Sequence, residues 1–111
     1  MRNSAEIERV KRQGSRHHTS LFSIASIPSD SAQSRVGIIV GKRLGTAVAR
    51  NRAKRLFREL ARLNRSRLAS HRAFLVFPKR HALEVSYAEL RERWDAALRR
   101  TGLVNPNTGE P

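Results

Sequence analysis

The chain has 111 residues, about the length of one domain, and carries 23 Lys and Arg against 9 Asp and Glu, a formal net charge of +14. A domain of this size buries only a modest core and has no room for a second catalytic domain, and the absence of cysteine excludes disulfides, thiolate nucleophiles and Cys-based metal sites. A charge this large on a small body repels itself, so it favours a protein that usually binds a polyanion.

The sequence also limits which polyanion is expected. The longest apolar run, residues 36–40, is far shorter than a membrane span, and the charged first 14 residues lack the apolar stretch of a signal peptide. Most of the basic residues are arginine, whose planar group binds phosphate through two hydrogen bonds and stacks on bases. We therefore expect a cytoplasmic RNA-binding protein with no membrane partner and no small-molecule substrate.

Apolar periodicity and breaker residues divide the chain into elements. Gly14 and Gly102 each end a helix, and Pro28 and Pro78 each close a strand. The predicted elements, in chain order, are a helix over 4–12, an additional short strand near 14–18, strands over 20–27 and 35–41, a helix from about 47 to 67, a strand over 73–77 and a helix over 87–100. The main order, α-β-β-α-β-α, predicts one α+β domain over residues 1–102 with three helices on a small central sheet, followed by a flexible tail over 103–111.

The second helix is predicted to be strongly two-sided. On a wheel at about 100° per residue, one stripe is apolar and the opposite face is basic, with Asn51 at its centre. The apolar stripe contains Ala49, Ala53, Leu56, Phe57, Leu60 and Leu63, and the basic residues on or bordering the other face are Arg50, Arg52, Lys54, Arg55, Arg58, Arg62 and Arg65. The single acid, Glu59, lies near an edge.

This basic face differs from an ordinary solvated face. Solvated helices usually mix signs to gain i,i+4 pairs, as the last helix does with Glu89 and Arg93. Here like charges lie three and four residues apart, which costs a few tenths of a kcal/mol per pair unless an anion intervenes. Lys42 and Arg43 lie just before the helix, whose N-terminal N–H groups also favour anions, with Thr46 as the candidate N-cap. The pattern predicts phosphate binding.

The stretch "KRLGTAVARNRAKRLFRE", residues 42–59, resembles the signature of the bacterial ribonuclease P protein component. The match lies in two basic residues, a glycine, Ala-Val, the Arg-Asn-Arg core, Lys-Arg and Arg-Glu. The "VGIIV" strand before it, the "FLVF" strand after it and "SYAEL" at the last helix extend the resemblance over roughly residues 5–100.

The resemblance implies a fold, a function and an RNA-binding site. The fold is three helices on a sheet with a left-handed βαβ crossover, which the usual right-handed rule would not suggest. The function is to assist a catalytic RNA, which carries the active site and its magnesium ions, in removing the 5′ leader from precursor tRNA. The residues expected to face the catalytic RNA are Lys42, Arg43, Arg50, Asn51, Arg52, Lys54, Arg55 and Arg58, with Arg62 added from the wheel.

The resemblance also implies a leader-binding cleft lined with aromatic rings. The matching positions here are Ile7, Lys11, Ala25 and Phe74, so only Phe74 keeps a ring. Phe22 is a second candidate ring, with a core position as the alternative. We therefore expect the leader to be held more by charge, through Lys11, Arg12 and Arg16, than by stacking.

Other functions fit the sequence less well. A nuclease active site in the protein itself would need convergent groups, but His17 and His18 are adjacent on a predicted strand and would point to opposite faces. A structural RNA-binding protein, such as a small ribosomal protein, fits the charge equally well. A sequence-specific DNA binder is a weaker alternative, because no dimer seam or separate recognition helix is evident.

Overall fold

The computed structural model describes residues 4–29, 35–63 and 72–103. The predicted continuation of the second helix to residue 67 and nearly all of the predicted tail lie outside these ranges. Among the described residues, no helix is long and apolar enough to cross a membrane.

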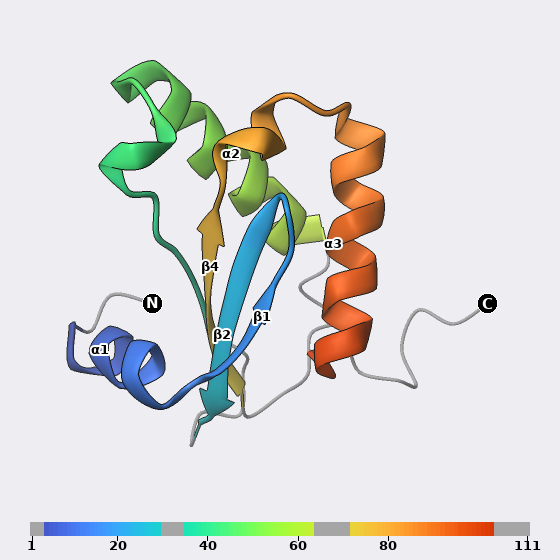
Figure 1. Ribbon diagram of the computed structural model, residues 1–111. Helices are drawn as coiled ribbons and strands as arrows, with labels where there is room; N and C mark the ends of the chain where they lie inside the picture. Colours follow the sequence, from blue (N-terminus) through green and yellow to red (C-terminus); the bar gives the residue numbers. More distant parts are fainter. Residues whose placement is uncertain (1–3, 30–34, 64–71, 104–111) are drawn as a thin grey trace.

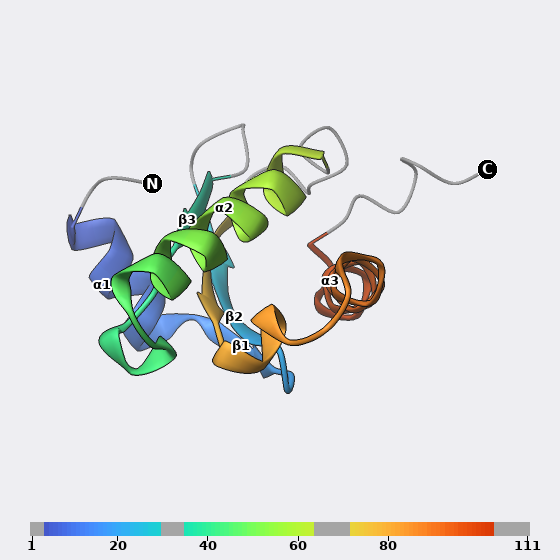
Figure 2. The same cartoon turned by 90° about the horizontal axis from the view of Figure 1, so that it is seen from above.

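The domain is one four-stranded sheet with helices on both faces (Figures 1 and 2). The elements are α1 (Ser4–Gln13), β1 (Ser15–His18), β2 (Phe22–Pro28), β3 (Arg35–Ile38), the 3-10 helix η1 (Lys42–Leu44), α2 (Ala47–Leu63), β4 (Arg72–Pro78), the 3-10 helix η3 (Arg80–Leu83) and α3 (Tyr87–Thr101). The α+β class and the order of helices and strands are as predicted, and the additional short strand near residues 14–18 is β1.

The strand order is β1-β2-β4-β3, with β3 parallel to β4 and the other pairs antiparallel. The connection between β3 and β4 runs through α2, and such crossovers are right-handed in about 98% of cases. Here it is left-handed: viewed from the α2 side with both strands pointing up, β4 lies to the left of β3 (Figures 1 and 2). Strand β3 is an edge of the sheet, and three of its four residues are half-buried.

Side chains on the two faces of the sheet form two separate apolar clusters. The cluster under α2 and α3 is the larger and contains Phe22, Phe57 and Trp94, whose ring centroids lie 5.6–5.8 Å apart in tilted or edge-on pairs. Such arrangements suit the ring quadrupoles and add to the burial energy. The smaller cluster, under α1, centres on Val10 and Leu75. The sheet therefore keeps α1 apart from α2 and α3.

Local capping fixes where the helices begin and end. Thr46 Oγ1 accepts a hydrogen bond from the Ala49 amide at 3.2 Å, and Ser86 Oγ accepts one from the Glu89 amide at 3.1 Å. These bonds satisfy amides that have no partner inside the helix. Gly102 ends α3 in the left-handed conformation at φ 74°. The caps at Thr46 and Gly102 agree with the sequence prediction.

Gly14 is needed for close approach between α1 and β2. A Cβ built there would lie 2.4 Å from the Val10 carbonyl oxygen and 3.2 Å from backbone atoms of Ser26. We expect Gly14→Ala to lower the free energy of unfolding by about 1–3 kcal/mol, the usual cost of overpacking, as measured by urea denaturation. Gly41→Ala is the matched control, because its Cβ would meet nothing within 4 Å. Equal losses in both variants would contradict this account.

Candidate nucleic-acid interface

The basic face of α2 is anchored from behind by apolar residues. Ala53, Phe57 and Leu60 are fully buried against the sheet side of the helix, as the predicted apolar stripe requires. Before the helix, Leu44 is buried in η1 while the two basic residues beside it are exposed. The backbone of both elements is therefore held by the core, and the basic side chains are left on the outside.

We use the term basic surface for the nine predicted RNA-facing residues on η1 and α2. Seven of them are exposed and two, Arg50 and Lys54, are half-buried. The exposed members are Lys42, Arg43, Asn51, Arg52, Arg55, Arg58 and Arg62. The structure thus brings all nine onto two consecutive elements, with a solvent-accessible cationic face that can neutralise the phosphates of a polyanion. Arg65 lies outside the described residues.

One member of the basic surface has a partner of opposite sign. Arg62 Nε donates to Glu59 Oε1 at 3.1 Å, and its Nη2 donates to the second oxygen of the same carboxylate. The hydrogen bond from Arg62 lowers the pKa of the Glu59 carboxyl below its ordinary value, and the same bond raises the pKa of Arg62. The carboxyl is therefore ionised at neutral pH and competes with phosphate for Arg62.

This competition can be tested by removing the carboxylate charge. We expect Glu59→Gln to strengthen RNA binding and to steepen the log–log salt dependence by up to about 0.9, the value for one more neutralised phosphate. Filter binding over a salt series measures both quantities. Glu92→Gln on α3 removes the same charge away from the basic surface and should change binding less. An equal gain in both variants would show that only net charge matters.

The register of the sheet decides which predicted leader-binding residues lie together. Arg16 is opposite Ala25 and His18 is opposite Ser23, so these residues share the face that α1 covers. His17 is opposite Ile24 and points to the other face, as expected for adjacent residues of a strand. On α1, Ile7 and Lys11 are half-buried, and Arg12 is exposed.

Three predicted leader-binding residues are placed wrongly by the sequence interpretation. Phe22 and Phe74 are both 0% exposed and belong to the cluster under α2 and α3, on the opposite face of the sheet from α1, so the alternative of a core position is confirmed for Phe22. Ala25 is on the α1 face but is also fully buried, in the cluster around Val10. None of the three can touch a ligand, because packing in the core removes them from the surface.

The ring that does lie on the α1 face is Phe77, which sequence reasoning missed. Phe77 is half-buried against the cluster under α1, and the Arg16 guanidinium lies 5.5 Å from its ring centroid. Arg16 also donates a hydrogen bond to the Lys11 carbonyl at 3.0 Å. Strand alternation could have shown that residues 74 and 77 face opposite ways. It could not have shown which of the two faces α1 would cover.

His18 completes this part of the face. Its Nδ1 is 2.8 Å from Ser23 Oγ, and Ser23 is opposite Phe77 in the register of β2 and β4. We use the term α1-side surface for Ile7, Lys11, Arg12, Arg16, His18 and Phe77. It combines cationic groups, one partly accessible ring and an imidazole, the kinds of group that hold single-stranded nucleic acid. Among the described residues, no three His, Asp or Glu side chains are grouped to hold a metal ion.

The chain folds as a small α+β domain. One face of its sheet carries a cationic helix, and the other carries cationic groups beside an aromatic ring. These features are typical of proteins that bind polyanions. Comparison with known proteins identifies the family. A family model described as Ribonuclease P matches residues 1–102. The chain belongs to the ribonuclease P protein component family.

Individual relatives and solved structures agree with this assignment. The ribonuclease P protein component of Roseiflexus castenholzii is 32% identical over 111 residues, which covers 99% of this chain and 91% of the relative. That of Desulforapulum autotrophicum is 33% identical over 88 residues, covering 79% and 75%. The RNase P protein of Staphylococcus aureus has the same fold, with a TM-score of 0.84 at 23% identity and coverage of 95% and 96%. The RNase P protein of Thermotoga maritima has a TM-score of 0.81 at 24% identity, covering 90% and 94%.

Proposed function

We propose that this protein, as the ribonuclease P subunit, binds the catalytic RNA through the basic surface and the 5′ leader of precursor tRNA through the α1-side surface. The observation that carries the proposal is the basic surface itself, seven of whose nine residues are exposed on a helix anchored by the core. Among the residues that the structure describes, only one of its arginines, Arg62, pairs with a carboxylate. A face of this kind suits the phosphate backbone of a folded RNA.

The two surfaces lie on opposite faces of the sheet, which supports simultaneous binding. α2 packs on one face and α1 on the other (Figure 2). A catalytic RNA against α2 would leave α1, β1 and the end of β4 open to a single strand. The protein would then contribute by neutralising phosphates of both RNAs and by holding the leader.

We propose that the catalytic RNA, and not the protein, carries out the chemistry of leader removal. The magnesium ions of the reaction would be held mainly by the catalytic RNA, and the complex would work in the cytoplasm. The protein's own residues would lower the electrostatic cost of bringing two polyanions together, a cost that is greatest when little magnesium is available to screen it.

Reconstitution tests this function directly. Adding the protein to a bacterial ribonuclease P RNA at low magnesium should stimulate cleavage of a precursor tRNA at its mature 5′ end. Rates with and without protein, over a range of magnesium and monovalent salt, measure the effect. A structural RNA-binding protein would bind the RNA without stimulation. No stimulation under any salt condition would therefore overturn the proposal.

A further inference from the structure

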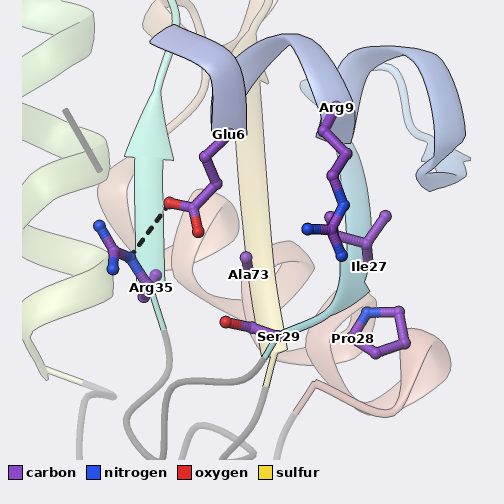
Figure 3. A pocket seen from close by; sticks show the side chains of 7 residues that line it. All are labelled: Glu6, Arg9, Ile27, Pro28, Ser29, Arg35 and Ala73. Carbon is purple, nitrogen blue, oxygen red and sulfur yellow. Dashed lines mark ion pairs between the residues drawn. The ribbon is translucent and has the colours of Figure 1, made fainter. Parts of the chain in front are cut away.

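A small pocket lies beside α1, over the ends of the strands where β2 finishes and β3 and β4 begin (Figure 3). Its volume is about 150 Å³, and it is lined by Glu6, Arg9, Ile27, Pro28, Ser29, Arg35 and Ala73. Glu6 and Arg9 point from α1 down the face of the sheet, and Arg35 reaches toward Glu6 from β3 (Figure 3). The pocket shares no residue with the basic surface or with the α1-side surface.

Helical geometry places the pocket and the α1-side surface on opposite sides of α1. Val10 is fully buried and marks the direction in which α1 faces the sheet. At about 100° per residue, Glu6 and Arg9 fall to one side of Val10, and Ile7 and Lys11 fall to the other. A ligand in the pocket would therefore lie across α1 from the proposed leader contacts.

The pocket has a charged rim, and most of its accessible lining is polar. Arg35 Nε lies 3.1 Å from Glu6 Oε1, and the two side chains remain 41% and 22% exposed, so a ligand can reach both. Arg9 is exposed, and its guanidinium makes no hydrogen bond or ion pair with any residue that the structure describes. Ile27, Pro28 and Ala73 also line the pocket, although Ile27 and Ala73 are buried and offer little apolar surface (Figure 3). Two arginines and one glutamate give the rim a net charge of +1.

We propose that this pocket binds the phosphate and sugar of one ribonucleotide of an RNA strand, with the phosphate on Arg9 and a ribose hydroxyl donating to Glu6. The volume of about 150 Å³ is well below the roughly 300 Å³ of the smallest typical ligand pockets, so the base would lie outside the pocket. A carboxylate would repel a bare phosphate but accepts a hydrogen bond from a hydroxyl. The 2′-hydroxyl is the group by which proteins distinguish RNA from DNA.

The site can be tested on the protein alone, so its failure and the failure of the subunit role are distinguishable. Adenosine 5′-monophosphate titrated into ¹⁵N-labelled protein should shift the amides of Arg9, Ser29 and Arg35. Deoxyadenosine 5′-monophosphate should bind about tenfold more weakly, since it lacks the 2′-hydroxyl that donates to a charged acceptor. Inorganic phosphate should bind more weakly still. Equal binding of all three probes, or no shift at these amides, would overturn the proposal.

Two variants separate the parts of the site. Arg9→Gln should remove most of the binding of adenosine 5′-monophosphate. Glu6→Gln should keep binding but reduce the preference over the deoxynucleotide, and thermal unfolding will show whether loss of the pair with Arg35 alters stability. Arg91→Gln, an exposed change of equal charge on α3, should leave both quantities unchanged. A loss with Arg91→Gln as large as that with Arg9→Gln would overturn the proposal.

The nucleotide could come from the substrate or from the catalytic RNA, and cross-linking distinguishes them. Because the chain contains no cysteine, Ser29→Cys provides a single attachment point for a photoreactive group beside the pocket and keeps Arg9 in place. In the reconstituted holoenzyme, a cross-link to precursor tRNA or to the catalytic RNA identifies the source. Ala96→Cys, an exposed position on α3, is the matched control. A yield from Ser29→Cys no higher than that from the control would contradict occupation of the pocket by either RNA.

Discussion

Replacing Arg55 and Arg58 together by alanine is expected to weaken binding of the catalytic RNA and to reduce the slope of log affinity against log salt by about 1.8. Each lost phosphate contact removes about 0.9 from this slope, because one fewer condensed counterion is released on binding. Both side chains are exposed on the face of α2 that points away from the buried Phe57. Filter binding at four or more salt concentrations gives the affinity and the slope together.

The matched control removes the same charge from α3. Arg91 and Arg99 are exposed on a helix that also carries three acids, so their replacement should lower affinity only slightly. If the α3 double variant loses as much slope as the α2 double variant, the protein binds RNA through total charge, and α2 has no special role. Circular dichroism of both variants checks that α2 and α3 remain folded.

Replacing Phe77 by leucine should selectively weaken substrates that carry a leader. Stacking of a base on an aromatic ring contributes about 1–3 kcal/mol, and leucine keeps the packing against the α1-side cluster but cannot stack. The holoenzyme's affinity for precursor tRNA should therefore fall by about 5- to 150-fold. Its affinity for mature tRNA should stay the same. The ratio of the two dissociation constants is the measurement.

Phe74→Leu is the internal control for this prediction. Phe74 has no exposed surface and packs with Phe22 under α2 and α3, so its replacement should lower the free energy of unfolding and leave the ratio unchanged. A change in the ratio with Phe74→Leu, together with no change with Phe77→Leu, would show that the structure assigns the wrong ring to the leader.

The contrast between these two phenylalanines shows how far the sequence could predict the site. The basic surface was predictable because the apolar stripe of a helix, here from Ala49 to Leu63, determines which side of that helix faces outward. The proposed leader contacts depend on the pairing of strands far apart in the chain. β2 and β4 are separated by β3 and α2 in the sequence, and only their register places Ser23 beside Phe77. No local pattern contains that information.

The fold shows the same division between local and non-local information. The caps at Thr46, Ser86 and Gly102 were predictable because each involves residues within one turn of the helix. The position of β3 at the edge of the sheet and the hand of its crossover were not derivable from local patterns. Both depend on how the whole chain packs, and the hand of the crossover was expected only from the family resemblance.

The separation of the two apolar clusters by the sheet has a consequence for how this family can diverge. Side chains under α1 share no cluster with the rings that hold α2, so a substitution on one face leaves the packing of the other intact. Ile7, Lys11 and Ala25 occupy positions where the family resemblance implies rings, and the ring of Phe77 is supplied instead by a neighbouring strand. Residues on the side proposed to bind the leader can thus be substituted without disturbing the packing of the side proposed to bind the catalytic RNA.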